Sequence, residues 1–244
     1  MNKQKIAIVG TGIGGLATGL RLSKLGFEVD VFEKLPCPGG RNNLLVDGGF
    51  KFDMGPSFIL MPDFFEELFS FCGEKLSDHL DLACIDPSYK IFYSDNECLT
   101  VHRDSLKTKE ELERFEPGAS KAFDDFINET RRIYVQVRPL LGNNFQISDL
   151  TNPRYWPLLA KIRPFESYWR LAKRFFKSEK LCYAFTFEAM FMGVSPYEAP
   201  AFYSIISYAD HVQKIFHPMG GMYQLPLALE RLARKFGCRF HYNS

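Results

Sequence analysis

Three common signals are absent from this sequence. No apolar run reaches the ~18 residues of a membrane-spanning helix, no cysteine pair has C-x-x-C spacing, and the formal net charge is only +1. These absences argue against a membrane-spanning protein, a zinc or redox motif and a globally basic protein, so we expect no nucleic-acid partner and no metal. Because the 244 residues are 46% hydrophobic, the chain can bury a core of its own.

The cysteines carry no evidence of a disulfide framework. The six are Cys37, Cys72, Cys84, Cys98, Cys182 and Cys238. Lys3 and Lys5, followed by the uncharged residues 6–20, look like the start of a signal peptide, but the glycines inside this stretch have nucleotide-binding spacing. We therefore expect reduced thiols and a cytoplasmic location.

The first 33 residues predict a strand, a glycine-rich turn, a helix and a second strand. Residues 5–9 are apolar and rich in β-branched side chains, which predicts a buried parallel strand. Residues 14–25 have helical periodicity and end before Gly26, a typical helix-terminating residue. Residues 28–33 alternate apolar and charged side chains, as a strand does. This order is the opening βαβ unit of a dinucleotide-binding fold.

The turn between the first strand and the helix has the pattern G-x-G-x-x-G, formed by Gly10, Gly12 and Gly15, with Gly14 as a further glycine. Such a turn places a pyrophosphate on the helix N-terminus, where free N–H groups and the helix dipole favour an anion. Glu33, at the end of the second strand, can accept hydrogen bonds from the adenosine ribose, although a solvated strand-end glutamate would look the same. The pattern disfavours NADP and leaves both NAD and FAD open.

A second cluster, Gly39-Gly40-Arg41, follows Glu33-Lys34 within a few residues. The fingerprint with E-K and then G-G-R resembles the superfamily of flavin-containing amine oxidases and phytoene desaturases. The resemblance implies that the cofactor is FAD and that these glycines and the arginine approach its diphosphate. Arg41 carries a permanent charge and five donors for an anionic cofactor, although a surface arginine could also be merely solvated.

Four later motifs narrow the resemblance to phytoene desaturases. They are F-D-x-G-P-S at residues 52–57, D-P-x-Y at 86–89, G-x-S-P at 193–196 followed by A-P-A, and P-x-G-G-M at 218–222. The resemblance places Gly55, Pro56 and Ser57 near the flavin. It implies dehydrogenation of a long acyclic isoprenoid, phytoene or its diapo analogue, with hydride passing to FAD. A carotenoid isomerase, a retinoid saturase or a non-catalytic prenyl-protein-binding relative remains open.

The remaining pattern predicts further elements and an α/β fold. Expected are a hairpin of residues 44–46 and 50–52 with an Asp47-Gly48 turn, a helix at 61–71, strands at 89–93 and 98–102, helices over 107–137 broken at Pro117-Gly118, a helix at 223–237 and a strand at 238–242. We predict a Rossmann-type FAD-binding domain in residues 1–75 and 215–244. An inserted α+β substrate-binding domain would occupy residues 76–214.

Residues 151–180 are unusually basic and aromatic. A basic helix with Trp and Phe on its other face is typical of a segment that lies in a membrane interface, which would suit entry of a bilayer-dissolved substrate. Aromatic side chains packed on the core beneath a solvated basic face are the alternative. We expect peripheral membrane contact through this segment.

No residue stands out as catalytic. His102, His211, His217 and Asp210 could accept a proton, but no spacing favours one of them. Members of the resembled family are about twice as long, with a second flavin-binding segment near the C-terminus. We therefore expect this sequence to be a fragment, a product of a split gene, a remnant, or one chain of a two-chain enzyme, and to be inactive alone.

Overall fold

The computed structural model describes residues 4–141 and 152–244 and divides them into two compact units. Unit 1 comprises residues up to 84 together with 216–244, and unit 2 comprises residues 85–215. Sequence analysis placed these boundaries near residues 75 and 215. Among the helices of the described ranges, none combines the length and apolar character that crossing a bilayer would require. The six cysteines are unpaired.

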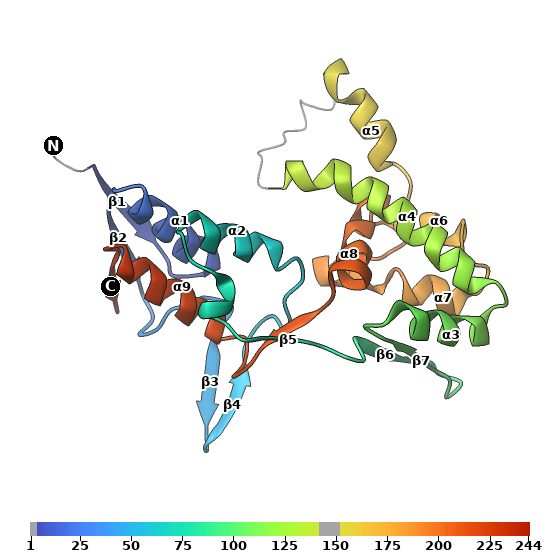
Figure 1. Ribbon diagram of the computed structural model, residues 1–244, viewed down its shortest axis with the longest axis horizontal. Helices are drawn as coiled ribbons and strands as arrows, with labels where there is room; N and C mark the ends of the chain where they lie inside the picture. The colour runs from blue at the N-terminus through green and yellow to red at the C-terminus, as the bar shows by residue number, and fades with distance from the viewer. Residues whose placement is uncertain (1–3, 142–151) are drawn as a thin grey trace. The chain divides into compact units, whose positions relative to one another are not determined.

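Unit 1 is built on a parallel sheet of strand order β1-β2-β9. Its strands are β1 (Lys5–Val9), β2 (Glu28–Glu33) and β9 (Arg239–Tyr242), and the helices α1 (Ile13–Lys24) and α9 (Gln224–Lys235) pack side by side although they are distant in sequence (Figure 1). Leu16 and Leu20 of α1 meet Val29 and Val31 of β2 in a buried core. The predicted βαβ unit is therefore confirmed.

The prediction that the first strand is buried is wrong. Burial along β1 alternates between exposed and intermediate, and Val9 is 91% exposed. Within the described residues β1 pairs only with β2, so one of its edges has no strand beside it. A periodicity argument detects the apolar side chains of a strand but not its place in the sheet.

The other elements of unit 1 lie around the sheet. They are β3 (Leu44–Asp47), β4 (Phe50–Asp53), α2 (Asp63–Phe71), a 3-10 turn at Leu76–Asp78, β5 (Leu82–Cys84) and β8 (Phe216–Pro218). β3 and β4 form the predicted hairpin, but Asp47 pairs with Phe50, so the turn consists of Gly48 and Gly49 rather than Asp47 and Gly48. β5 and β8 pair antiparallel where the chain leaves unit 1 and returns to it.

In its described residues, unit 2 is mainly helical with one hairpin. Its elements are β6 (Tyr89–Phe92), β7 (Cys98–Val101), α3 (Ser105–Phe115), α4 (Ala119–Val137), α5 (Trp156–Ile162), α6 (Tyr168–Lys173), α7 (Glu179–Ala184) and α8 (Ile205–Tyr208), with 3-10 turns at Arg138–Leu140, Pro153–Tyr155, Phe187–Met192 and Ala201–Ser204 and a π turn at Ala209–Gln213. The core is strongly aromatic, with Phe126, Tyr168, Phe176 and Phe185 fully buried.

The basic and aromatic segment does not form one amphipathic helix. α5 ends at Ile162, the following Arg163 has a left-handed backbone (φ 52°), and α6 begins only at Tyr168. Tyr168 and Phe176 are buried in the core, whereas Trp156 and Phe165 are exposed. The core-packing alternative therefore describes part of this segment; Thr151 lies outside the described residues.

Candidate dinucleotide site

The glycine-rich turn joins β1 to the N-terminus of α1. A Cβ atom at Gly15 would come within 2.1 Å of the Gly10 carbonyl oxygen, so glycine allows the helix to approach the strand. A Cβ atom at Gly12 would meet no atom within 4 Å, and Gly12 has an ordinary backbone (φ −63°). Gly15 is thus required by packing, whereas space is open above Gly12.

Two adjoining pockets lie at this turn. The first, of about 580 Å³, is lined by Gly12, Ile13, Gly14, Gly39, Arg41, Asn42, Gly55 and Pro56. The second, of about 490 Å³, is lined by Val9, Gly10, Gly12, Phe32, Glu33, Lys34, Leu35, Gly40, Arg41 and Ser244. Gly12 and Arg41 line both pockets. Of the residues predicted from the sequence, Gly15 and Ser57 line neither, and the Ser57 carbonyl oxygen lies 2.9 Å from His217 Nδ1.

Glu33 is buried and fixed by the glycine-rich turn. Its Oε2 accepts hydrogen bonds from the Thr11 backbone N–H (2.8 Å) and the Thr11 hydroxyl (2.7 Å), and its Oε1 accepts one from the Leu35 N–H (3.0 Å). Burial alone would raise the pKa of Glu33, but these hydrogen bonds outweigh it and the net pKa is lowered. Glu33 is therefore a preorganised anion that keeps acceptor capacity on Oε1 for a ribose hydroxyl.

The second glycine cluster packs against the first. The Gly39 N–H donates to the Thr11 carbonyl at 2.8 Å, and Gly39 forms a parallel bridge with Gly12. Arg41 follows on the rim of both pockets, exposed and without a hydrogen bond or ion pair to any described residue. An arginine without an acidic partner beside a helix N-terminus is suited to bind a diphosphate.

Asn42 and Asp53 were not predicted from the sequence. Asn42 donates to the Met222 carbonyl (3.2 Å), while its buried Oδ1 has no partner among the described residues and borders the first pocket. Asp53 accepts from the backbone N–H groups of Met222 (2.9 Å) and Tyr223 (3.3 Å), just before α9. These contacts join the motif at 52–57 to the motif at 218–222. The position of Asn42, directly after the G-G-R cluster, was the signal that could have revealed it.

Unit 2 contains a separate buried polar cluster of Glu188, Asp210 and His211, whose potential ligand atoms lie within 4.8 Å of one another. Burial and the neighbouring Asp210 carboxylate raise the pKa of Glu188 to about 8. Burial raises the pKa of Asp210 to about 7 and lowers that of His211 to about 3. The cluster unites two of the considered proton acceptors; His102 instead lies near Asp86, and His217 belongs to unit 1.

Sequence comparisons give relatives along the whole chain. The family model for an NAD(P)-binding Rossmann-like domain matches residues 8–74. The zeta-carotene-forming phytoene desaturase of Myxococcus xanthus is 40% identical over 99% of this chain and 47% of its own length. A phytoene desaturase of Phycomyces blakesleeanus is 37% identical over 98% of this chain and 42% of its own length. A 4,4'-diapophytoene desaturase of Methylomonas sp is 30% identical over 100% of this chain and 48% of its own length. The chain thus spans about half the length of these relatives.

Solved structures support the same fold. A redesigned putrescine oxidase superposes with a TM-score of 0.62 at 20% identity, covering 99% of this chain and 51% of its own. A Rab GDI from Plasmodium falciparum gives a TM-score of 0.58 at 13% identity, covering 99% of this chain and 58% of its own. The predicted Rossmann-type α/β class is therefore confirmed.

Proposed function

Because the chain belongs to the phytoene desaturase family and corresponds to the N-terminal half of its members, we propose that it forms one half of an FAD-dependent enzyme that desaturates an acyclic carotenoid precursor. The observation that carries the proposal is the 40% identity to a phytoene desaturase over 99% of the chain. The substrate class is phytoene or diapophytoene, since relatives with both names match the same residues.

The residues of unit 1 fit FAD. The relatives imply a dinucleotide cofactor, and the two pockets extend the binding surface beyond a single fingerprint turn. Gly10, Gly12, Gly14, Gly39 and Gly40 would line the diphosphate region, where Arg41 would neutralise charge. Glu33, with Lys34 beside it, would bind the ribose, and Gly55, Pro56 and Ser57 would lie toward the flavin. Bound FAD would supply the hydride acceptor, and these residues would hold and orient it.

The proposed enzyme also includes a segment that corresponds to the remaining half of the relatives' length. It would complete the cofactor and substrate sites, whether the same polypeptide or a second chain supplies it. We also propose a cytoplasmic protein that contacts the membrane peripherally through residues 151–180. The exposed Trp156 and Phe165 and the basic residues between them support this contact.

Pigment formation together with flavin content tests the proposal. The chain would be produced in a phytoene-accumulating bacterium with the reading frame that follows it, and in parallel with the C-terminal half of the Myxococcus xanthus relative. We expect coloured carotenoid and bound flavin. A Cβ atom at Gly12 would meet no atom within 4 Å, so Gly12→Ala should fold, and the methyl group in the space of the diphosphate should lower both flavin content and pigment.

Two other outcomes would contradict the proposal in different ways. Flavin without desaturated product would indicate a carotenoid isomerase or retinoid saturase. Absence of flavin from the wild-type pair would instead indicate a remnant or a non-catalytic prenyl-protein-binding protein.

A further inference from the structure

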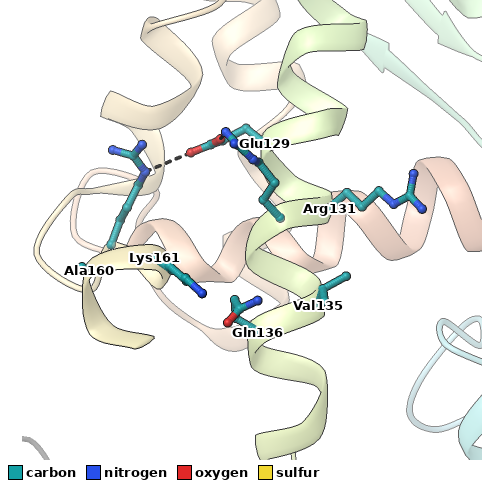
Figure 2. A pocket seen from close by; sticks show the side chains of 8 residues that line it. Glu129, Arg131, Val135, Gln136, Ala160 and Lys161 are labelled. Atoms are coloured by element: carbon teal, nitrogen blue, oxygen red, sulfur yellow. Dashed lines mark hydrogen bonds and ion pairs between the residues drawn. The ribbon is translucent and has the colours of Figure 1, made fainter. Parts of the chain in front are cut away.

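A cationic groove lies in unit 2 between α4 and α5. It has a volume of about 530 Å³ and is lined by Glu129, Arg131, Arg132, Val135, Gln136, Ala160, Lys161 and Arg163. Figure 2 shows Lys161 and Gln136 approaching each other from the two helices, whereas Arg131 is directed away from Lys161. Arg132, Lys161 and Arg163 are the remaining cations of the lining, and among its described residues Glu129 is the only acidic one.

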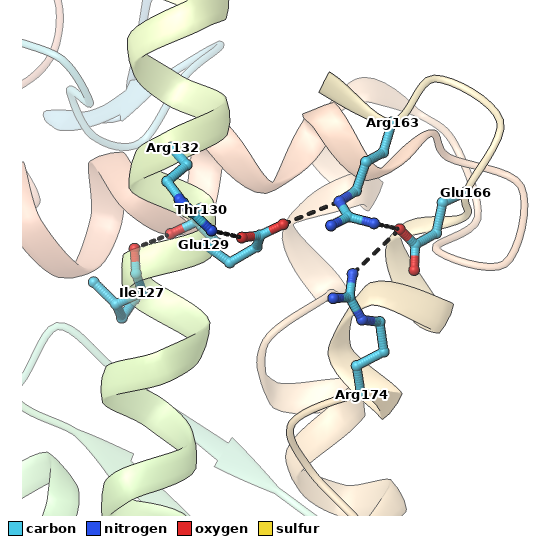
Figure 3. Close-up of polar contacts among 7 residues, drawn as sticks. All are labelled: Ile127, Glu129, Thr130, Arg132, Arg163, Glu166 and Arg174. Atoms are coloured by element: carbon cyan, nitrogen blue, oxygen red, sulfur yellow. Dashed lines mark hydrogen bonds and ion pairs between the residues drawn. The ribbon is translucent and has the colours of Figure 1, made fainter. Parts of the chain in front are cut away.

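Two of the groove arginines, Arg132 and Arg163, are held by a short ion-pair network (Figure 3). Glu129 lies between Arg163 Nε (3.0 Å) and Arg132 Nη1 (3.4 Å). Glu166 accepts from Arg163 Nη1 (3.2 Å) and also pairs with Arg174 (3.5 Å). Among the described residues three arginines thus share two carboxylates, which leaves an excess of positive charge. Two fixed donors orient the Arg163 guanidinium, and its second terminal nitrogen has no partner among the described residues.

The backbone at Arg163 is also unusual. It has φ 52°, a region that residues other than glycine rarely occupy, where a helix end commonly has glycine. Glu129 and Glu166 hold the Arg163 guanidinium in the lining of the groove. Lys161, two residues earlier, is exposed and has no hydrogen bond or ion pair with any described residue. The groove lining therefore contains an ammonium without a described partner and an oriented guanidinium, which are suitable for a phosphate group.

Apolar side chains accompany these cations. Val135 is 55% exposed in the groove lining, and Trp156 is 59% exposed one helical turn before Ala160 on α5. Residues four apart lie on the same face of a helix, so Trp156 follows the Ala160 side of α5. An exposed tryptophan near cations is typical of a surface at the level of lipid headgroups.

We propose that this groove binds the phosphate of an anionic phospholipid headgroup and so anchors unit 2 to a membrane. The inference rests on the proposed function, because it gives a defined site to the peripheral membrane contact. It extends that contact to α4, which the sequence did not indicate. Arg132, Lys161 and Arg163 would contact the headgroup, and Glu129 would position the two arginines.

Vesicle cosedimentation of the 244-residue chain tests the proposal. Vesicles would contain either phosphatidylcholine alone or equal parts of phosphatidylcholine and phosphatidylglycerol. We expect binding to the anionic vesicles only. The double variant R132E/K161E should bind them more than about 25-fold more weakly, since each basic residue near a lipid surface contributes about fivefold and the two new carboxylates are repelled by the anionic surface. The milder R132Q/K161Q variant should show a smaller loss in the same direction.

The matched control is K90E/K107E. Lys90 and Lys107 are exposed in the same unit and have no described partner, so this variant changes the net charge equally. It should retain most of the binding. An equal loss in both variants, no loss in either, or no wild-type binding to anionic vesicles would overturn the proposal. Release of the chain from vesicles by soluble glycerol phosphate would assign the groove to a soluble phosphate ester instead.

This readout is independent of catalysis. Vesicle binding without pigment would leave the groove assignment intact and contradict the desaturase proposal. Pigment without vesicle binding would support the desaturase proposal and contradict the groove assignment. Circular dichroism of each variant verifies its fold.

Discussion

Glu33 in unit 1 and Glu188 in unit 2 are both buried, yet their pKa values move in opposite directions. Glu33 lies at a strand end, where the N–H groups of Thr11 and Leu35 point at its carboxylate. The Glu188 carboxyl group accepts hydrogen bonds from the hydroxyl groups of Tyr168 and Ser207. Asp210, however, lies beside it as a second carboxylate. Burial sets the cost of the charge, and the neighbours decide whether the charge persists.

This difference gives the two units opposite responses to pH. A lowered pKa at Glu33 stabilises unit 1 above the unfolded-state value of 4.5, and that stability is lost as the pH falls. A raised pKa at Glu188 stabilises unit 2 at low pH. That stability is lost as the pH rises from 4.5 to about 8, because the unfolded chain releases the proton first. His211, whose pKa is lowered, opposes this trend only below its unfolded value of 6.5.

The largest effect is expected for Glu188→Gln. A neutral amide of the same shape removes the buried charge, so unit 2 should gain roughly 3 kcal/mol at about pH 8 and much less at about pH 5. The two tryptophans of the chain, Trp156 and Trp169, both lie in unit 2. Urea unfolding followed by tryptophan fluorescence therefore reports this unit.

Burial and Lys214, rather than Glu188, lower the pKa of His211, so its contribution should largely cancel between the variant and the wild-type protein. Tyr89, Tyr168 and Lys214 also surround the cluster, so the difference between the two pH profiles is the decisive quantity. A Glu188→Gln variant that is destabilised at both pH values would show that Glu188 is charged and compensated, and the comparison with Glu33 would break down.

A smaller effect of opposite sign is expected for Glu33→Gln. The amide NH₂ would face the Thr11 or Leu35 N–H groups, leaving a buried donor unsatisfied at a cost of about 2 kcal/mol. Hydrogen exchange followed by mass spectrometry should show faster exchange in β1, α1 and β2 and unchanged exchange in unit 2. Unchanged protection of β1 and α1 would mean that Glu33 does not fix the turn.

Features of unit 1 that arise from neighbouring residues could be predicted from the sequence, whereas those that depend on distant contacts could not. The bounds of β1, α1 and β2 follow from local periodicity and turn glycines, and Arg41 belongs to a short motif. Asn42 and Asp53 act through contacts with Met222, far along the chain. No local pattern records such a contact, although each partner lies within or directly after a recognised motif.

Unit 2 was less predictable for the same reason. Its hairpin and the break between α3 and α4 follow from turn residues and periodicity, and the structure confirms both. The grouping of Glu188 with Asp210, and of Arg132 with Lys161, depends on helix packing that sequence spacing does not specify. The apparent continuity of residues 151–180 was misleading because a left-handed residue, Arg163, can end a helix without glycine.

The smallest change in stability and a clear change in binding are expected for Arg41→Gln. Arg41 is exposed and has no described partner, so its loss should leave hydrogen exchange in unit 1 unchanged. Flavin affinity of the complete enzyme should fall about tenfold or more, because a charge-assisted hydrogen bond contributes about 1.5–3 kcal/mol. Lys75→Gln removes the same charge at an exposed position outside both pockets and is the matched control. If both variants bind flavin equally well, Arg41 is a solvated surface residue. If Arg41→Gln alone loses flavin, the anion site of unit 1 depends on a cation without a described partner, in contrast to Arg132 and Arg163 of unit 2, which are both paired with Glu129.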